Sequence, residues 1–216
     1  MTPREYMEAA RCPPWIRPQE FGLWTIQRLQ AGGQLTSPTE QAQHRERCGW
    51  PDYTLLRRMT LATMHTLGEI VMEDSQLELR KHLPIWIAGR GRVLVTGLGL
   101  GCVVRGLLAN RNVDQIDVVE LDDDILRVVG PEFARDPRVT LHHGDALTID
   151  LPGRFDLAWH DLWVDGPNLQ VLHAKLFLRF KNRCGPQGAW AFPRKFARLM
   201  SWQLLGAPRR RRHGRP

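Results

Sequence analysis

The sequence predicts an α/β protein with a doubly wound, mostly parallel β-sheet. Between residues 92 and 192, short apolar stretches typical of buried strands alternate with stretches of helical periodicity, and the connections are short. The stretch 92–97 is a continuous apolar run that leads directly into a glycine-rich loop, as buried parallel strands often do. The 216 residues suffice for one domain with an N-terminal appendage.

The first 67 residues are expected to form a helical extension. One helix is placed within 18–31, where Gly32 and Gly33 would end it. A second helix is placed over 53–66, with Asp52 as its N-cap. Proline-containing breakers between them predict a loop over 34–51.

The remaining chain is expected to form the sheet domain, residues 68–206, followed by a basic disordered tail, residues 207–216. A strand over 68–74 and a helix over 76–87, which contains Pro84, precede the alternating region. The expected strands there are 92–97, 115–120, 138–143, 155–160 and 188–192, and the expected helices are 102–110, 123–129, 168–180 and 195–205.

The charge is concentrated at one end of the chain. The net charge is +7, but residues 209–216 hold five arginines, and without them 25 basic residues stand against 23 acidic ones. The folded part is therefore nearly neutral, and nucleic acid is an expected partner only through the basic tail.

Composition and cysteine usage favour a cytoplasmic protein without a membrane partner. No apolar run approaches the roughly 18 residues that cross a bilayer, and residues 1–15 lack the apolar region of a signal peptide. The four cysteines include no C-x-x-C pair, which favours reduced thiols over a zinc site. The oligomeric state does not follow from the sequence.

The carboxyl ends of the predicted strands are where a ligand should bind. The first strand of the alternating region runs into the segment Gly97-Leu-Gly-Leu-Gly101, whose glycines let the backbone approach a ligand at a helix N-terminus. Because position 102 is Cys, the spacing is G-x-G-x-G and not the dinucleotide fingerprint. This loop suits a ligand without a pyrophosphate bridge.

Acids stand at the ends of the next three strands: Glu120, Asp145 and Asp161. Glu120 could accept hydrogen bonds from both hydroxyls of a ribose, and the alternative is a solvated acid at the strand end. Asp145 could accept a hydrogen bond from an exocyclic amine, and the alternative is an Asx turn. Asp161 should lie beside the glycine loop, since the first and fourth strands are neighbours in this topology. His143, His160 and Asp161 could hold a metal only if adjacent strand positions faced the same side, so no metal is expected.

Taken together, the segments 93–101, 117–122, 139–146 and 155–161 resemble class I S-adenosylmethionine-dependent methyltransferases. Within that superfamily they look most like the spermidine-synthase branch. The resemblance covers about residues 68–192 and implies the Rossmann-like methyltransferase fold and S-adenosylmethionine as cofactor. It is poorly specific for the substrate, and a small-molecule acceptor is the expected partner. It implies cofactor-binding roles for Gly97, Gly99, Gly101, Glu120, Leu121, Asp145 and Ala146, and a catalytic role for Asp161.

The resemblance also implies which part of the cofactor or acceptor each of these residues would contact. The glycines would pass close to the methionine part of the cofactor, and Glu120 would hold the ribose hydroxyls. Asp145, with the backbone of Ala146, would face the adenine. Asp161 would lie near the acceptor, where it could orient an amine or accept its proton.

Several features depart from the spermidine-synthase pattern. The second acid after the fourth strand is Asp165, four positions beyond Asp161 instead of three. The Tyr-His-Glu signature before the core is missing, and Glu78 and His82 are only a loose counterpart. The adenine-methylating Asp-Pro-Pro-aromatic motif is absent as well. After the fifth strand, only one helix is expected where methyltransferase sheets usually add an antiparallel hairpin.

Four functions therefore stand as hypotheses. The first is a methyltransferase acting on a small molecule or an accessible side chain. The second is an aminopropyl transferase that uses decarboxylated S-adenosylmethionine. The third is a non-catalytic nucleotide-binding or interaction protein on the same fold, and a nucleic-acid methyltransferase is the fourth.

Overall fold

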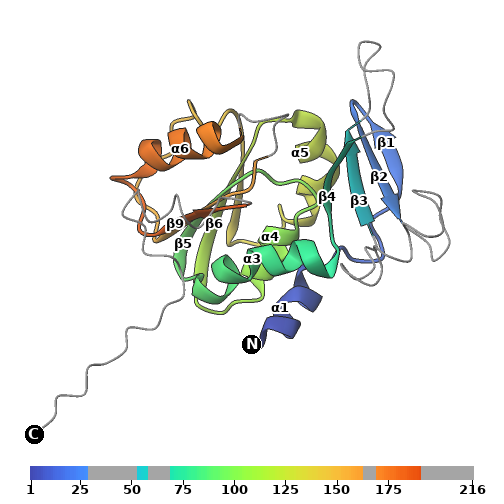
Figure 1. Cartoon of the computed structure of the whole chain (residues 1–216), viewed down its shortest axis with the longest axis horizontal. Coiled ribbons are helices and arrows are strands. Elements are labelled where there is room, and N and C mark those ends of the chain that lie inside the picture. Colours follow the sequence, from blue (N-terminus) through green and yellow to red (C-terminus); the bar gives the residue numbers. More distant parts are fainter. Residues whose placement is uncertain (29–52, 58–68, 163–168, 191–216) are drawn as a thin grey trace, which may run out of the picture.

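The computed structural model describes residues 1–28, 53–57, 69–162 and 169–190, which form two β-sheets and their flanking helices (Figure 1). The larger sheet has five parallel strands in the order β7-β6-β5-β8-β9. This order confirms the predicted doubly wound, Rossmann-like fold. From β5 the chain adds β6 and β7 on one side of the sheet and then β8 and β9 on the other, so the strand order reverses at β5. The strands are β5 (Gly91–Thr96), β6 (Val113–Glu120), β7 (Val139–His143), β8 (Leu157–His160) and β9 (Gln187–Ala189).

Helices cover both faces of this sheet because its strands are apolar on both sides. Along β5, Val93 and Val95 belong to the core cluster that includes residues of α3, α4 and α5, whereas Leu94 belongs to the cluster with Leu176 of α6. Figure 1 shows α6 apart from α3 and α4, with the sheet between them. The helices are α3 (Gln76–Ala88), α4 (Cys102–Leu108), α5 (Asp123–Val129), the short 3₁₀ helix η2 (Gly130–Glu132) and α6 (Leu169–Phe180).

Local capping explains where two of these helices begin. The side chain of Ser75 accepts a hydrogen bond from the Glu78 N–H and starts α3, which continues through Pro84 to Ala88. The side chain of Asp122 accepts hydrogen bonds from two backbone N–H groups of the first turn of α5. The predicted helices over 76–87 and 123–129 are therefore confirmed.

The N-terminal region is not the helical extension that the sequence predicts. Only α1 (Pro3–Ala10) is helical among its described residues, and its strands form an antiparallel sheet in the order β1-β2-β3-β4 together with the strand predicted over 68–74, which is β4. The expected helices over 18–31 and 53–66 are wrong wherever the structure describes them. The four strands are β1 (Gln19–Phe21), β2 (Trp24–Arg28), β3 (Tyr53–Arg57) and β4 (Glu69–Glu73).

A hairpin accounts for the first of these errors. Phe21 pairs with Trp24 across a two-residue turn, and Gly22 in that turn has a φ of +48°. Trp24 and Ile26 are buried with the period of two that a strand has. The glycine and this alternation outweigh the helical spacing of the segment.

Other boundaries differ by a few residues. The strand predicted over 155–160 begins at Leu157, with Phe155 in an isolated bridge to Cys184, and the strand predicted over 188–192 is β9. Asp52, the loop over 34–51, the helix over 195–205, the tail and the region of the possible C-terminal hairpin lie outside the described residues. Cys12, Cys102 and Cys184 are free thiols, and no helix in the described ranges is long and apolar enough to cross a membrane.

One buried carboxylate ties the N-terminal segment to the rest of the molecule. Asp74, between β4 and α3, is 1% exposed. Its oxygens accept hydrogen bonds from the Cys12 N–H at 3.0 Å and from the Tyr53 N–H at 2.8 Å. The segment after α1 and the start of β3 are thus held at the same point.

We expect Asp74→Ala to lower the free energy of unfolding by about 2–4 kcal/mol, because two buried N–H groups would lose their acceptor. Chemical denaturation measures this change. Asp150→Ala is the control, since the Asp150 side chain is fully exposed (100%), and surface changes of this kind stay within about 0.5 kcal/mol. Equal stability of the two variants would contradict the anchoring role of Asp74.

Candidate active site

A cavity of about 630 Å³ lies at the carboxyl ends of the parallel strands, beside the point where the strand order reverses. This size and place are those of a small-molecule site in a doubly wound sheet. The structure brings seven of the eight predicted site residues to its wall: Gly97, Gly99, Glu120, Leu121, Asp145, Ala146 and Asp161.

The glycine loop is pressed against the end of β8. Gly97 has a φ of +94°, and a Cβ at this position would stand 2.1 Å from the backbone oxygen of Asp161. On the other side, the Asp161 N–H donates to the Thr96 carbonyl at 2.8 Å. Only glycine allows this approach, so Gly97 determines how closely the loop and Asp161 face the same cavity.

Gly101 is the one predicted residue that does not line the cavity. It is the N-cap of α4 with a φ of +81°, and a Cβ there would stand 2.5 Å from the Phe133 ring. Gly101 therefore shapes the turn into α4 and does not line the cavity.

Glu120 connects the end of β6 to the glycine loop. One carboxylate oxygen accepts the Leu98 N–H at 2.7 Å and the other accepts the Asp122 N–H at 2.9 Å. Burial raises the pKa of Glu120, and the backbone hydrogen bonds oppose that change. The carboxylate is thus fixed in orientation, and each oxygen retains a lone pair for a ligand hydroxyl.

Asp145 and Leu121 lie at the rim of the same cavity. Asp145 is exposed and its Oδ1 accepts the Leu147 N–H at 2.8 Å, so it also forms the Asx-type turn that the sequence left as an alternative. Leu121 is 65% exposed, which is unusual for leucine and leaves an apolar surface beside the acids.

Asp161 is the most strongly perturbed acid of the site. Its side chain is only 7% exposed. Burial raises its pKa to about 8; the negative charges of Glu78 and Glu120 add to this, and Lys81 opposes it. Near neutral pH, Asp161 is therefore mostly protonated, and the carboxyl can hold or donate a proton close to the cavity.

The N-terminal sheet contributes to the cavity wall, which was not predicted from the sequence. Trp24, Leu55, Val71 and Met72 form one wall. Trp24 donates from its indole nitrogen to Asp122 at 2.8 Å, which joins this sheet to the end of β6. The feature of the sequence that indicates this sheet is the alternation of apolar residues around a glycine. The predicted helix did not take this alternation into account.

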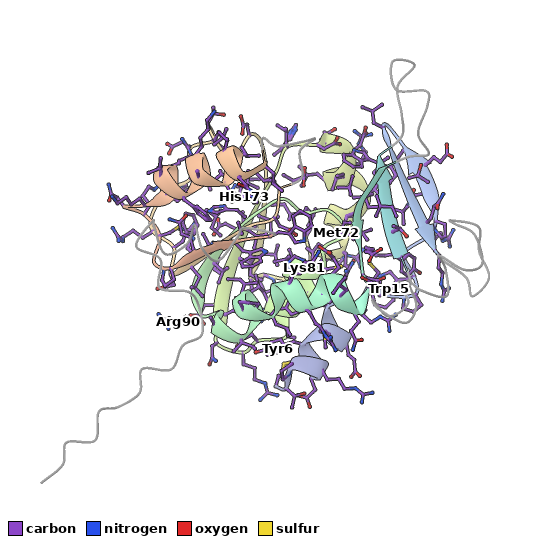
Figure 2. The ribbon with its side chains drawn as sticks, in the orientation of Figure 1. Tyr6, Trp15, Met72, Lys81, Arg90 and His173 are labelled. Atoms are coloured by element: carbon purple, nitrogen blue, oxygen red, sulfur yellow. The ribbon has the colours of Figure 1, made fainter. Side chains whose placement is uncertain are left out.

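Met72 of β4 is in direct contact with the glycine loop. Its sulfur accepts the Leu100 N–H at 3.1 Å, and a Cβ on Gly99 would stand 2.7 Å from the same atom. Figure 2 shows Met72 on β4 and Lys81 on α3, both toward the middle of the molecule. The second sheet thus rests on the glycine loop itself.

Helix α3 supplies a further set of polar groups. Glu78 lines the cavity, accepts a hydrogen bond from the Trp190 indole N–H and pairs with Lys81 at 2.6 Å. The Lys81 ammonium stands 4.8 Å from the centre of the Trp190 ring. From the sequence, Glu78 was considered only as a loose counterpart of the Tyr-His-Glu signature.

The three residues considered for a metal do not converge. His160 lies between Thr96 Oγ1 and Gln187 Oε1, each at 3.1 Å, and burial lowers its pKa to about 4. His143 faces the Leu121 carbonyl at 3.1 Å. Asp161 lines the cavity instead, so adjacent strand positions point apart as the sequence predicts.

The charge of the cavity wall is one-sided. Five acids line it and, among the described residues at the wall, none is Arg, Lys or His. Such a wall favours a cationic or neutral ligand over an anionic one. The acids are Glu78, Glu120, Asp122, Asp145 and Asp161.

Two kinds of curated protein are similar to this chain, while no protein-family model matches it. Over 112 residues it is 36% identical to ribosomal RNA small subunit methyltransferase A of Pseudomonas syringae pv. tomato, covering 52% of this chain and 35% of that protein. Over 100 residues it is 33% identical to spermidine synthase 1 of Hyoscyamus niger, covering 38% of this chain and 32% of that protein. The chain spans about a third of the length of these relatives.

Solved methyltransferase structures are also similar, at lower identity. The amino pentose methyltransferase CalS10 of Micromonospora echinaspora, with S-adenosylmethionine bound, has a TM-score of 0.39 at 24% identity, covering 52% of this chain and 49% of that one. The 23S rRNA methyltransferase ErmE has a TM-score of 0.43 at 17% identity, covering 55% and 47%. Because these scores are low, the fold assignment depends on the strand order of this chain.

In sequence, this chain is therefore similar to class I S-adenosylmethionine-dependent methyltransferases, the superfamily that its own motifs resemble. The curated matches include rRNA methyltransferases as well as spermidine synthases. The narrower resemblance to the spermidine-synthase branch is thus not exclusive.

We expect Gly97→Ala to be more destabilising than Gly153→Ala in thermal unfolding. Both glycines have a left-handed φ, so each alanine costs about 1–2 kcal/mol for that conformation. Only the alanine at 97 also meets backbone, whereas at 153 the nearest atom is the far end of the Arg92 side chain. A smaller loss for Gly97→Ala would show that the loop and β8 can move apart.

Proposed function

We propose that this protein is an S-adenosylmethionine-dependent methyltransferase that acts on a small molecule or an accessible side chain. One observation carries the proposal: the glycine loop and the acids Glu120, Asp145 and Asp161, which come from four different strand ends, face a single cavity. A ribose, an amine and a close backbone approach require this combination of groups.

The residues at the cavity wall fit this cofactor. Glu120, already fixed by two backbone N–H groups, would hold the ribose hydroxyls. Asp145 and the backbone of Ala146 would face the adenine, with the exposed Leu121 beside it. The backbone at Gly97 and Gly99 leaves the space that the methionine part needs, because a Cβ at either position would meet neighbouring atoms.

S-adenosylmethionine supplies a methyl group that is already activated by the positive sulfur. The protein therefore has to align an acceptor and exclude water. The apolar wall of Trp24, Leu55 and Val71 would exclude water. Asp161 would align the acceptor. The positive charge of the cofactor favours the carboxylate form of Asp161, which can orient an amine or take its proton.

The acid-lined cavity favours a small-molecule acceptor over RNA. One relative is by name a ribosomal RNA methyltransferase. Nucleic-acid sites contact phosphates with Arg and Lys, and the described wall of this cavity has neither. The lining therefore supports a neutral or amine-bearing acceptor.

Calorimetry with S-adenosylmethionine and its demethylated product tests the proposal. We expect both to bind the folded protein, and we expect Asp145→Ala to weaken binding by about tenfold because one charged acceptor for the adenine is lost. Asp150→Ala, which removes a fully exposed acid, should bind as the wild type does. A folded wild-type sample that binds neither compound would refute the function.

An aminopropyl transferase is the second candidate. The negative charge of Glu78 raises the pKa of Asp161, so the two acids are close to each other. Two neighbouring acids suit a diamine, which carries positive charge. A methyltransferase uses S-adenosylmethionine with its carboxylate in place, so the proposed function predicts that S-adenosylmethionine binds at least as well as its decarboxylated form. Tighter binding of the decarboxylated form would favour the aminopropyl transferase instead.

A further inference from the structure

His82 of α3 is a buried histidine without a hydrogen bond. Its side chain is 0% exposed, and neither ring nitrogen has a hydrogen-bond partner. Nε2 stands 4.0 Å from Oδ2 of Asp161. The ring packs 5.7 Å from the Trp86 ring and, edge-on, 5.8 Å from the Trp159 ring.

Packing alone does not explain a histidine at this place. Buried polar groups almost always have a partner, and a phenylalanine would fill the same space without two unpaired nitrogens. The two indoles fix the ring. The gap to Asp161 is shorter than the about 4.5 Å that a bridging water needs, so a small rotation of the carboxyl would close it into a direct hydrogen bond.

The charge states of the two groups are complementary. Burial lowers the pKa of His82 to about 3, and the nearby Lys81 charge contributes, so the imidazole is neutral and one nitrogen can accept a proton. Asp161 is mostly protonated near neutral pH. The charged groups that face it are Glu78 and Lys81 from α3 and Glu120 from β6.

We propose that His82 is a positioning residue for Asp161, with Nε2 accepting a hydrogen bond from the carboxyl O–H on Oδ2. The role of this pair rests on the proposed methyltransferase function. The hydrogen bond stabilises the protonated acid, so Asp161 stays uncharged in the free protein. When a cationic ligand binds or the pH rises, the O–H bond breaks, the proton passes to solvent and the carboxylate becomes available to the acceptor.

Nitrogen NMR of the free, full-length protein with ¹⁵N-labelled histidine tests the contact directly. Because His82 does not itself titrate near neutral pH, its signals should move with the ionisation of Asp161, at a midpoint of about 8. The movement should vanish in Asp161→Ala, and the His173 signals should not share it. His82 signals that stay constant between about pH 6 and pH 9.5, or a midpoint that persists in Asp161→Ala, would overturn the proposal.

Variants of His82 test the role through the affinity for S-adenosylmethionine measured across pH. The cation binds the ionised Asp161 better, so wild-type affinity should rise by up to about tenfold per pH unit and level off above about pH 8. His82→Phe removes the acceptor that stabilises the protonated acid, so the plateau should begin about one pH unit lower. His82→Gln, which keeps an acceptor oxygen, should retain most of the wild-type profile.

The control is His173→Phe, a substitution of another buried histidine that packs beside Phe177, and its profile should match the wild type. An unchanged profile in folded His82→Phe refutes the positioning role. Absence of S-adenosylmethionine binding in every protein refutes the proposed function and leaves the NMR result to decide on the contact itself.

Discussion

The close approach of the glycine loop to the end of β8 is the constraint on which the site depends. At Gly97, the backbone passes so near the Asp161 carbonyl that no side chain fits between them. Pairing of β5 with β8 keeps these two strand ends in register, and pairing of β5 with β6 brings Glu120 to the loop from the other side. The cavity is therefore a product of strand order, and its acids meet because parallel strands end at one edge.

The second sheet adds a wall to the cavity at this edge. Met72 and Trp24 touch the parts of the core that the cofactor would contact, namely the glycine loop and the acids after β6. Burial is also the main cause of the raised pKa at both Glu120 and Asp161, and residues of this sheet, of α3 and Trp190 share the cavity with these acids. The chemistry of the core acids thus depends on residues far from them in sequence.

The sheet domain could be predicted from the sequence, and the N-terminal sheet could not. Buried parallel strands appear as continuous apolar runs that end in glycines or acids, so the strands and the residues at their ends were recognisable one at a time. The segment around Trp24 is short, so the alternation of its apolar residues and the single Gly22 were weak signals for a hairpin against a helix. The pairing of His82 with Asp161 depends on the packing of α3 beside β8, which no local pattern encodes.

The link between Trp24 and Asp122 has a consequence for how such a protein can diversify. The groups that we propose to face the cofactor follow strands of one sheet, whereas Trp24, Leu55, Val71 and Met72 of the cavity wall belong to the other. Under the proposed function, substitutions on β2, β3 and β4 would therefore reshape one wall of the cavity while the residues that would hold the cofactor keep their positions. The first third of the chain would then tune the shape of the cavity with little effect on the acids at the strand ends.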